Sequence, residues 1–344
     1  MKPKHLITIA FLSLLIGLPV GLLIMARAQT PATSPPAVSN YRLSGPYTHK
    51  NLTVFLVHGK DQSNKTFLTL QEALAQKKVR LYETKDVNEL SIRNLSNQDI
   101  YVQAGDIVRG GDQDRMISMD FIVPPKSGRM PIAAFCVESG RWNKRGKEEN
   151  ASFASSENAA TNGLKLAAKS EKSQQAVWDN VKVVQASLTE NVGSTVNSSV
   201  SASSMELSME DSKVKETSAA YINTLSGLLQ SRSDVIGYVL AINGKVTSAD
   251  VYASHALFAK LWPKLLKSNA VEAIAALNDA EHNPVTSESV QGFLAESEKA
   301  TAEAKDVTPR VRMVTREDDK NIFSETQDRQ QKDGYIHRNY MRKQ

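Results

Sequence analysis

VIGYVLAINGKVTSADVY, residues 235–252, is the stretch that most clearly predicts how this chain folds. Two runs rich in β-branched residues flank the pair Asn243-Gly244. A two-residue type I′ turn favours Asn-Gly because both of its positions need a positive φ. The stretch therefore predicts a β-hairpin near the centre of the fold.

The regions on either side of this hairpin differ in pattern. Before residue 142, short strand-like runs bounded by Gly, Pro and Asn predict a mainly antiparallel N-terminal sheet or sandwich. These runs lie at 52–57, 79–84, 89–96, 116–125 and 130–138, with a short amphipathic helix at 69–76. After residue 163, helical periodicity dominates, and a second hairpin is expected around 332–334 near the C-terminus.

Four helices are expected in the second half of the chain. Val177, Val181, Val184 and Leu188 form a helical stripe, and further helices are expected at about 214–229, 254–278 and 286–304. Pro263 removes an amide donor and is expected to kink or restart the third of them. Sheet, helices and two hairpins together predict the α+β fold class.

The domain organisation follows from changes in composition. Residues 1–28 resemble a signal peptide or membrane anchor, and the Pro/Ser/Thr-rich residues 29–44 resemble a tether. Residues 45–344 are expected to form a single α+β domain. The polar stretches near 143–163 and 191–212 are expected to be mobile insertions.

The N-terminal segment predicts export to the periplasm or the cell exterior. Lys2 and Lys4 precede a long apolar run, and Ala26-Arg27-Ala28 offers a cleavage site after Ala28. The alternative is an uncleaved membrane anchor, because the apolar run is almost long enough to span a bilayer. Contact with a membrane is expected only through this segment.

Charge and motif content exclude several classes of function. The chain has 42 basic and 37 acidic residues, and three of the bases lie in the N-terminal segment, so the remainder is nearly neutral and predicts no nucleic-acid partner. Neither a phosphate-binding P-loop nor a G-x-S-x-G nucleophile motif is present. One cysteine and six dispersed histidines predict no metal site, and no cofactor is expected.

The stretch GDIVRGGDQDR, residues 105–115, carries the strongest functional signal. Gly110-Gly111 can direct backbone amides at an anion, and Arg109 and Arg115 can add bidentate, charge-assisted hydrogen bonds. The alternative is a tight turn between strands in which Gly and Asp are common.

The stretch CVESGRW, residues 136–142, is open to two similar interpretations. Glu138 and Arg141 could be a salt bridge covered by Trp142, or a polar pair at the rim of a pocket. Cys136 is expected to be a buried small residue. His337 and Arg338 could reach the same site from the last hairpin.

These motifs together resemble a bacterial and archaeal family, the ADP-ribosyl-glycohydrolase-and-rhodanese/phosphatase-superfamily-associated protein domain. The resemblance covers about residues 45–340 and rests on AGDIVRGGDQDRMISMDFIVPP, PIAAFCVESGRW, VLAINGKVTSADVYASHALFAKLWPKLLKSNAVEAI and ETQDRQQKDGYIHRNY. It implies a domain of unknown function with neighbours in ADP-ribose or NAD-linked metabolism, and no catalytic residue. The chain departs from the family pattern at Asp106 and at 269–271.

Three functions remain open at this point. The preferred one is an exported module that binds an anionic small molecule or partner. The second is a hydrolase of a phosphate- or ribose-containing compound, with Glu138 as acid or base. The third is a structural or assembly protein. The candidate binding residues are Gly110, Gly111, Gln113, Arg115, Glu138, Arg141, Trp142, His337 and Arg338.

Overall fold

A computed structural model describes residues 41–142, 152–278, 280–331 and 334–343. The expected signal segment lies outside these residues, as does most of the expected tether. The described part of the chain is α+β, as the sequence predicts, and its strands form three sheets that are almost entirely antiparallel. Within it, no helix has the length and apolar character needed to cross a membrane.

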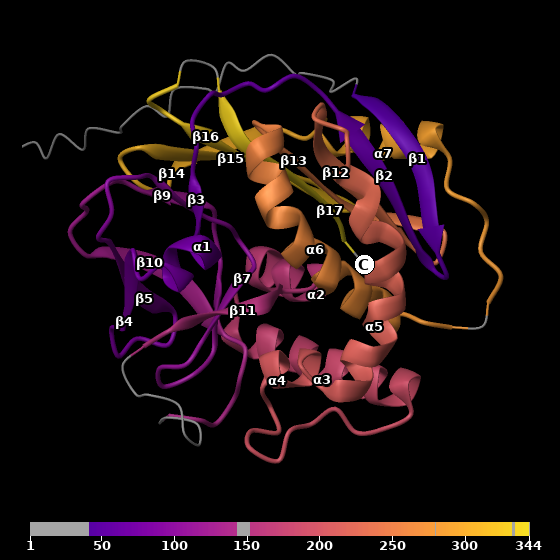
Figure 1. Cartoon of the computed structure of the whole chain (residues 1–344), viewed down its shortest axis with the longest axis horizontal. Coiled ribbons are helices and arrows are strands. Elements are labelled where there is room, and N and C mark those ends of the chain that lie inside the picture. Colours follow the sequence, from indigo (N-terminus) through magenta and orange to yellow (C-terminus); the bar gives the residue numbers. More distant parts are fainter. Residues whose placement is uncertain (1–40, 143–151, 279, 332–333, 344) are drawn as a thin grey trace, which may run out of the picture. The chain divides into compact units, whose positions relative to one another are not determined.

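The largest sheet has the Asn-Gly hairpin at its centre (Figure 1). Asn243 and Gly244 have φ values of 52° and 70°, as a type I′ turn requires. In order across the sheet, the eight strands are β1 (Arg42–His49), β2 (Leu52–His58), β12 (Val235–Ile242), β13 (Lys245–Tyr252), β17 (Tyr335–Arg342), β16 (Asn321–Asp328), β15 (Val311–Glu317) and β14 (Ala302–Asp306).

Both faces of this sheet are covered, which explains why every residue of β12 is buried. Alternate residues of a strand point to opposite faces. Tyr238 and Leu240 belong to the core under the larger helices, whereas Val239 packs in the core that includes α7 (Ser287–Ser297). The larger helices are α3 (Gln174–Val192), α5 (Ser212–Leu225) and α6 (His255–Ala275).

Two smaller sheets carry the N-terminal strands. The six-stranded sheet runs β11 (Ala154–Ala159), β7 (Asp106–Arg109), β8 (Arg115–Ile117), β10 (Met130–Cys136), β5 (Glu89–Asn94) and β4 (Val79–Glu83). The three-stranded sheet comprises β3 (Leu68–Thr69), β6 (Ile100–Val102) and β9 (Phe121–Val123). Helix α1 (Leu70–Ala75) begins at a capping box formed by Thr69 and Glu72, and it packs in the core of these sheets.

Four short helices lie between the longer elements. The helix α2 (Asn162–Leu166) and the π-helix η1 (Ala167–Glu171) connect β11 to α3. The helix α4 (Met205–Met209) lies between α3 and α5, and the 3-10 helix η2 (Ser226–Leu229) lies between α5 and β12. Helix α2 continues directly into η1, whose backbone hydrogen bonds join residues five apart rather than four apart as in an α-helix. This pair of elements carries two lysines that are central to the site described below.

The structure differs from the sequence expectations at several points. Strand β1 begins at Arg42, inside the expected tether, and β11 lies inside the expected insertion at 143–163, where it pairs with β7. The expected strand at 116–125 is divided into β8 and β9. Helix α6 passes through Pro263 without a break, and the expected helix at 286–304 ends at Ser297, before β14.

Candidate functional site

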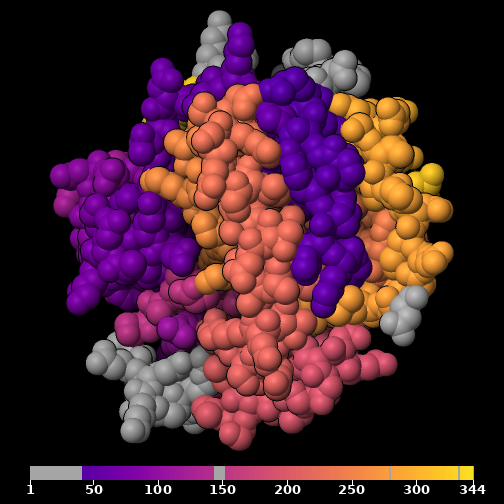
Figure 2. All heavy atoms as spheres, turned by 45° about the vertical axis from the view of Figure 1, so that its right-hand side comes forward, coloured from indigo at the N-terminus to yellow at the C-terminus, as the bar shows by residue number. Residues whose placement is uncertain are grey.

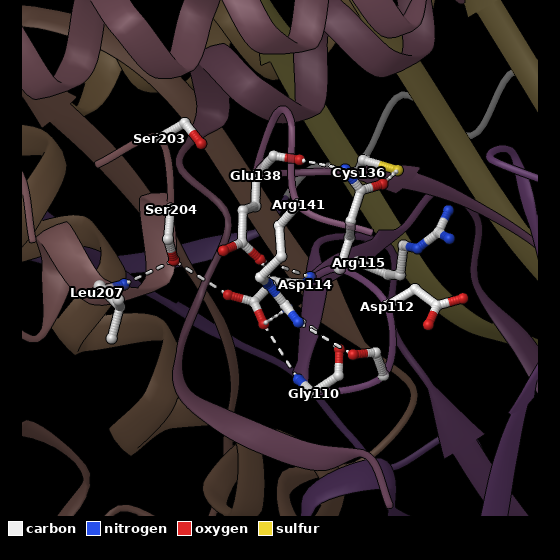
Figure 3. A network of polar contacts seen from close by, with 12 residues as sticks. Gly110, Asp112, Asp114, Arg115, Cys136, Glu138, Arg141, Ser203, Ser204 and Leu207 are labelled. Atoms are coloured by element: carbon white, nitrogen blue, oxygen red, sulfur yellow. Dashed lines mark hydrogen bonds and ion pairs between the residues drawn. The ribbon is translucent and has the colours of Figure 1, made fainter. Parts of the chain in front are cut away.

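The loop between β7 and β8 and the segment after β10 lie side by side (Figure 3). Strand β10 pairs with β8, so that Cys136 lies opposite Arg115. The two stretches singled out in the sequence, 105–115 and 136–142, are therefore neighbours in space. We call the contacts between them the glycine-loop network, comprising Glu83, Gly110, Gly111, Gln113, Asp114, Arg115, Glu138 and Arg141.

The glycine loop contacts carboxylates of the same chain. The amide of Gly110 donates to Asp114 Oδ1 at 3.1 Å. The amide of Asp112 donates to Glu83 Oε1 at 2.9 Å, and the other oxygen of Glu83 contacts Arg115 at 3.1 Å. The amides of Gly110 and Asp112 thus already donate to carboxylates of the protein and are not available to an external anion.

The Arg141 guanidinium joins the loop to Glu138. One nitrogen donates to the Gly111 carbonyl at 3.0 Å, and the other lies 2.7 Å from Glu138 Oε2. The same Glu138 oxygen accepts the amide of Asp114 at 3.1 Å, and Ser204 donates to Asp114 Oδ2 at 3.0 Å. Glu138 and Asp114 are fully buried, and both are engaged by hydrogen bonds and ion pairs within the chain.

The chemistry of Glu138 and Cys136 agrees with a bracing role. Burial alone would raise the pKa of Glu138, but hydrogen bonds, the largest from Arg141, bring the pKa below its usual value. A general acid needs the opposite shift. Burial raises the pKa of the Cys136 thiol to about 11, and its sulfur lies 2.8 Å from Gln113 Oε1. Cys136 is therefore a buried thiol rather than a nucleophile.

The remaining sequence candidates are not members of this network. Trp142 directly follows Arg141 in the chain and is 56% exposed. Arg338 contacts Glu325 at 2.6 Å and the hydroxyl of Tyr41 at 3.0 Å. The structure does not bring His337 to the glycine loop, and its two ring nitrogens contact carboxylates elsewhere.

His337 lies at the centre of a second network, which we call the His337 network and which includes Asp120 and Asp250. His337 Nδ1 is 2.6 Å from Asp120 Oδ2, and Nε2 is 2.9 Å from Asp250 Oδ1. The ring of Tyr252 stacks on the imidazole with centroids 4.4 Å apart. All three charged residues are at least nine-tenths buried.

Strand register explains how this network forms. In β13, β17 and β16, one row across the sheet contains Asp250, Asn339 and Ser324, and the next row on the same face contains Tyr252, His337 and Thr326. Residues two apart on a strand share a face. Asp120 contacts this face from the connection between β8 of the six-stranded sheet and β9 of the three-stranded sheet. In the sequence, the polar residues that alternate at every second position of these three strands were the only sign that this face of the sheet is polar.

The charges of the His337 network are fixed by its contacts. Burial would lower the pKa of His337, but Asp120 and Asp250 raise it to about 9, so the ring is an imidazolium at neutral pH. Burial would raise the pKa of Asp120, but His337 brings it down to about 2. Both carboxylates also accept hydrogen bonds from neutral donors, namely Ala104, Thr326, Tyr238 and Asn339.

The raised pKa of His337 predicts a pH-dependent stability. Between pH 6.5 and 8 the folded state binds more protons at His337 than the unfolded state does, so the free energy of unfolding should fall as pH rises. The expected fall is roughly 1–2 kcal/mol. Urea unfolding at several pH values measures it, and His337→Gln should remove this part of the slope. An unchanged slope in that variant would contradict the assignment. Lys169 acts in the opposite sense as its folded-state pKa of about 8 is approached, so it offsets a small part of this fall near pH 8.

Two lysines face this network from α2 and η1, and we call Lys165 and Lys169 the lysine pair. Lys169 Nζ donates to Ser324 Oγ at 3.0 Å and to Asn339 Oδ1 at 2.8 Å. Lys165 is only 7% exposed, and its Nζ has neither a hydrogen bond nor an ion pair among the described residues. Its side chain crosses Gly105, where a Cβ would lie 2.9 Å from Lys165 Cδ.

The lysine pair carries a surplus of N–H donors. Burial is the main cause that lowers the pKa of Lys169 to about 8, and the charge of Lys165 adds to the shift. Asp250 and Asp120 already accept hydrogen bonds from His337 and from neutral donors. No group of three or more His, Cys, Asp and Glu side chains in the described ranges is placed to hold a metal ion. Neither lysine could be identified as a site residue from the sequence, because a lysine on a short helix has no distinctive pattern around it.

Comparison with known families gives one match. The family described as the ARG and Rhodanese-Phosphatase-superfamily-associated Protein domain matches residues 40–341, which include both networks and the lysine pair. Comparisons with curated proteins and with solved structures found no match.

Proposed function

We propose, from the premise that this chain belongs to the ARG and Rhodanese-Phosphatase-superfamily-associated Protein domain family, that it binds an anionic small molecule at the lysine pair. The observation that carries the proposal is Lys165, which is only 7% exposed and whose Nζ has no hydrogen bond or ion pair among the described residues. A buried charge without such partners costs several kcal/mol. An anion would supply the missing acceptors and the opposite charge.

The surroundings of the lysine pair favour an anion over a cation. His337 offsets one of the two negative charges of Asp120 and Asp250, and Lys165 also stabilises ionised Asp250. His337 and the two lysines together exceed these two carboxylates by one positive charge. Lys169 has a hydrogen bond to Ser324 and another to Asn339, and an ammonium has three N–H donors. A phosphate or carboxylate could therefore accept from both lysines at once. Lys169 is partly exposed, whereas Lys165 is buried.

This proposal places the ligand apart from the glycine loop. The loop has the composition of an anion cradle, but Asp114 and Glu83 accept from two of its amides. We propose that the glycine-loop network braces the six-stranded sheet. A hydrolase centred on Glu138 gains no support from its lowered pKa and its ion pair with Arg141.

Thermal unfolding with a panel of anions tests the proposed site. The panel contains inorganic phosphate, ADP-ribose, sugar phosphates, nucleotides and small carboxylates. A member present at 100 times its dissociation constant should stabilise the protein by about 2.7 kcal/mol, which corresponds to a rise in Tm of roughly 5 °C. Lys165→Met should abolish this rise, whereas the exposed Lys182→Met should retain it. No shift with any member would count against anion binding.

We further propose that the protein is exported and acts outside the cytoplasm. Support comes from the charged start, apolar run and Ala26-Arg27-Ala28 sequence of the N-terminal segment. Expression of the full chain with intact-mass measurement of the exported fraction should give a product that begins at Gln29. A product that retains residues 1–28 and fractionates with membranes would support the anchor instead.

A further inference from the structure

We propose that Ser44, His58 and Asp234 form a serine-hydrolase triad at the edge of the large sheet, and that its substrates are esters whose acyl group carries a carboxylate. This activity goes beyond anion binding at the lysine pair and uses none of the same residues. Ser44 Oγ lies 2.7 Å from His58 Nε2, and His58 Nδ1 lies 3.1 Å from Asp234 Oδ2. This is the order of contacts in a nucleophile, base and orienting acid.

Adjacent strands of the large sheet bring the three residues together. Ser44 lies on β1, His58 ends β2, and Asp234 immediately precedes β12. In the ladder, His58 pairs with Arg42 on one side and with Val235 on the other. Ser44 is thus a diagonal neighbour of His58, within reach of side-chain contact.

The direction of the hydrogen bonds suits nucleophilic attack. His58 contributes most to the lowered pKa of Asp234, so this carboxylate is ionised at neutral pH and accepts from His58 Nδ1–H. His58 Nε2 is then the acceptor for the Ser44 hydroxyl proton. His58 is buried whereas Ser44 is partly exposed, so the base is held in place beside an accessible hydroxyl.

Tyr47 offers a donor for the oxyanion that forms during the reaction. Its hydroxyl donates to Ser44 Oγ at 3.4 Å, and it would have to turn from this oxygen to the acyl oxygen during the reaction. The guanidinium of Arg232 lies 5.0 Å from the centre of the Tyr47 ring. An irregularity in the β1–β2 ladder between Ser44 and Tyr47 breaks the regular alternation at this point.

Two arginines indicate the chemical class of the acyl group. Arg42 shares a face of β1 with Ser44, has a side chain that is 66% exposed, and pairs with Asp234. Arg232 Nη1 is buried and has no hydrogen-bond partner among the described residues. A carboxylate on the acyl chain would supply that partner. Strand β1 is the edge of the sheet. Figure 2 shows the indigo N-terminal strands at the surface, beside the salmon segment that contains α5.

The reaction is an ordinary two-step acyl transfer to water. Ser44 Oγ bonds to the carbonyl carbon while its proton moves to His58 Nε2, and the bond to the alcohol breaks as His58 returns that proton to the leaving oxygen. Water then attacks the acyl-Ser44 ester with His58 again as base. The Ser44–acyl bond breaks as His58 returns the proton taken from water to Ser44 Oγ, and the dicarboxylic acid is released. No oxidant, metal or further reactant is needed.

The test uses the full chain with two substrates and one covalent probe. The mono-4-nitrophenyl ester of succinic acid should be hydrolysed above background and faster than 4-nitrophenyl acetate. Ser44→Ala and His58→Gln should each lower kcat/KM at least 1000-fold. Thr48→Ala, on the same strand, should leave the rate unchanged. Arg232→Gln should reduce the preference for the succinyl ester about 10-fold while sparing the acetate.

A fluorophosphonate probe reads out the nucleophile independently of turnover. Loss of fluoride should leave the phosphonyl group on the peptide that contains Ser44, and His58→Gln should prevent the labelling. If Ser44→Ala proves unfolded by circular dichroism, Tyr47→Phe serves instead, and it should lower kcat with an unchanged Tm. Hydrolysis at the background rate, or probe attached to another residue, would overturn the proposal.

Discussion

Replacing His337 with Leu should lower the free energy of unfolding by about 3–5 kcal/mol. The imidazolium lies 2.6 Å from Asp120 and 2.9 Å from Asp250, and all three residues are buried. Without it, two carboxylates remain in the protein interior close to each other and without their shared counter-charge. Urea unfolding of the variant and of the wild type at pH 7 measures the difference.

A second His→Leu variant serves as the control, because it shows the cost of replacing a histidine that lies outside the His337 network. His282 is partly exposed and hydrogen-bonds only to Asn278 among the described residues, so His282→Leu should cost less than about 1 kcal/mol. Adding Asp120→Asn to His337→Leu removes one of the two charges and should recover part of the loss. A cost below about 1 kcal/mol for His337→Leu would mean that the network contributes little to stability.

Replacing Arg141 with Met should have a similarly large effect, about 3–5 kcal/mol. The guanidinium contacts Glu138 and Asp114, both fully buried, and donates to the Gly111 carbonyl. Methionine preserves much of the side-chain volume but none of these contacts. The thermal melt should shift down even in the absence of any ligand, because Arg141 holds two strand ends together.

An exposed ion pair offers a control for this second prediction. Arg312 lies 3.1 Å from Asp306, and both side chains are more than 40% exposed, so Arg312→Met should change the Tm little. If Arg141→Met kept the Tm of the wild type but lost a ligand-dependent shift, the glycine loop would be a ligand cradle after all. The bracing role of the glycine-loop network would then be wrong.

Local features of the fold could be predicted from the sequence. Asn243-Gly244 predicts the central hairpin, the valines of α3 predict a buried face, and the predicted burial of Cys136 is confirmed. Each of these depends on neighbours within a few residues. The α+β class follows from the same local signals, because it needs only the types and order of the elements.

The candidate site was harder to predict because its contacts are distant in sequence. Asp120 and His337 are 217 residues apart, and Asp114 and Ser204 are 90 residues apart. The division of 116–125 into two strands has the same origin, since Asp120 turns towards Ala104 and His337. Single-sequence patterns identified His337 and Glu138 as unusual but did not identify their partners.

Isothermal titration at the lysine pair tests the proposed function most directly. Inorganic phosphate and ADP-ribose are titrated separately into the wild type, Lys165→Met, Lys165→Arg and Lys182→Met. We expect saturable binding of at least one probe at one site per chain, weakened at least 10-fold by Lys165→Met and retained by Lys165→Arg and Lys182→Met. Binding that is unaffected by Lys165→Met, or absent for both probes, would contradict an anion site at Lys165 and Lys169.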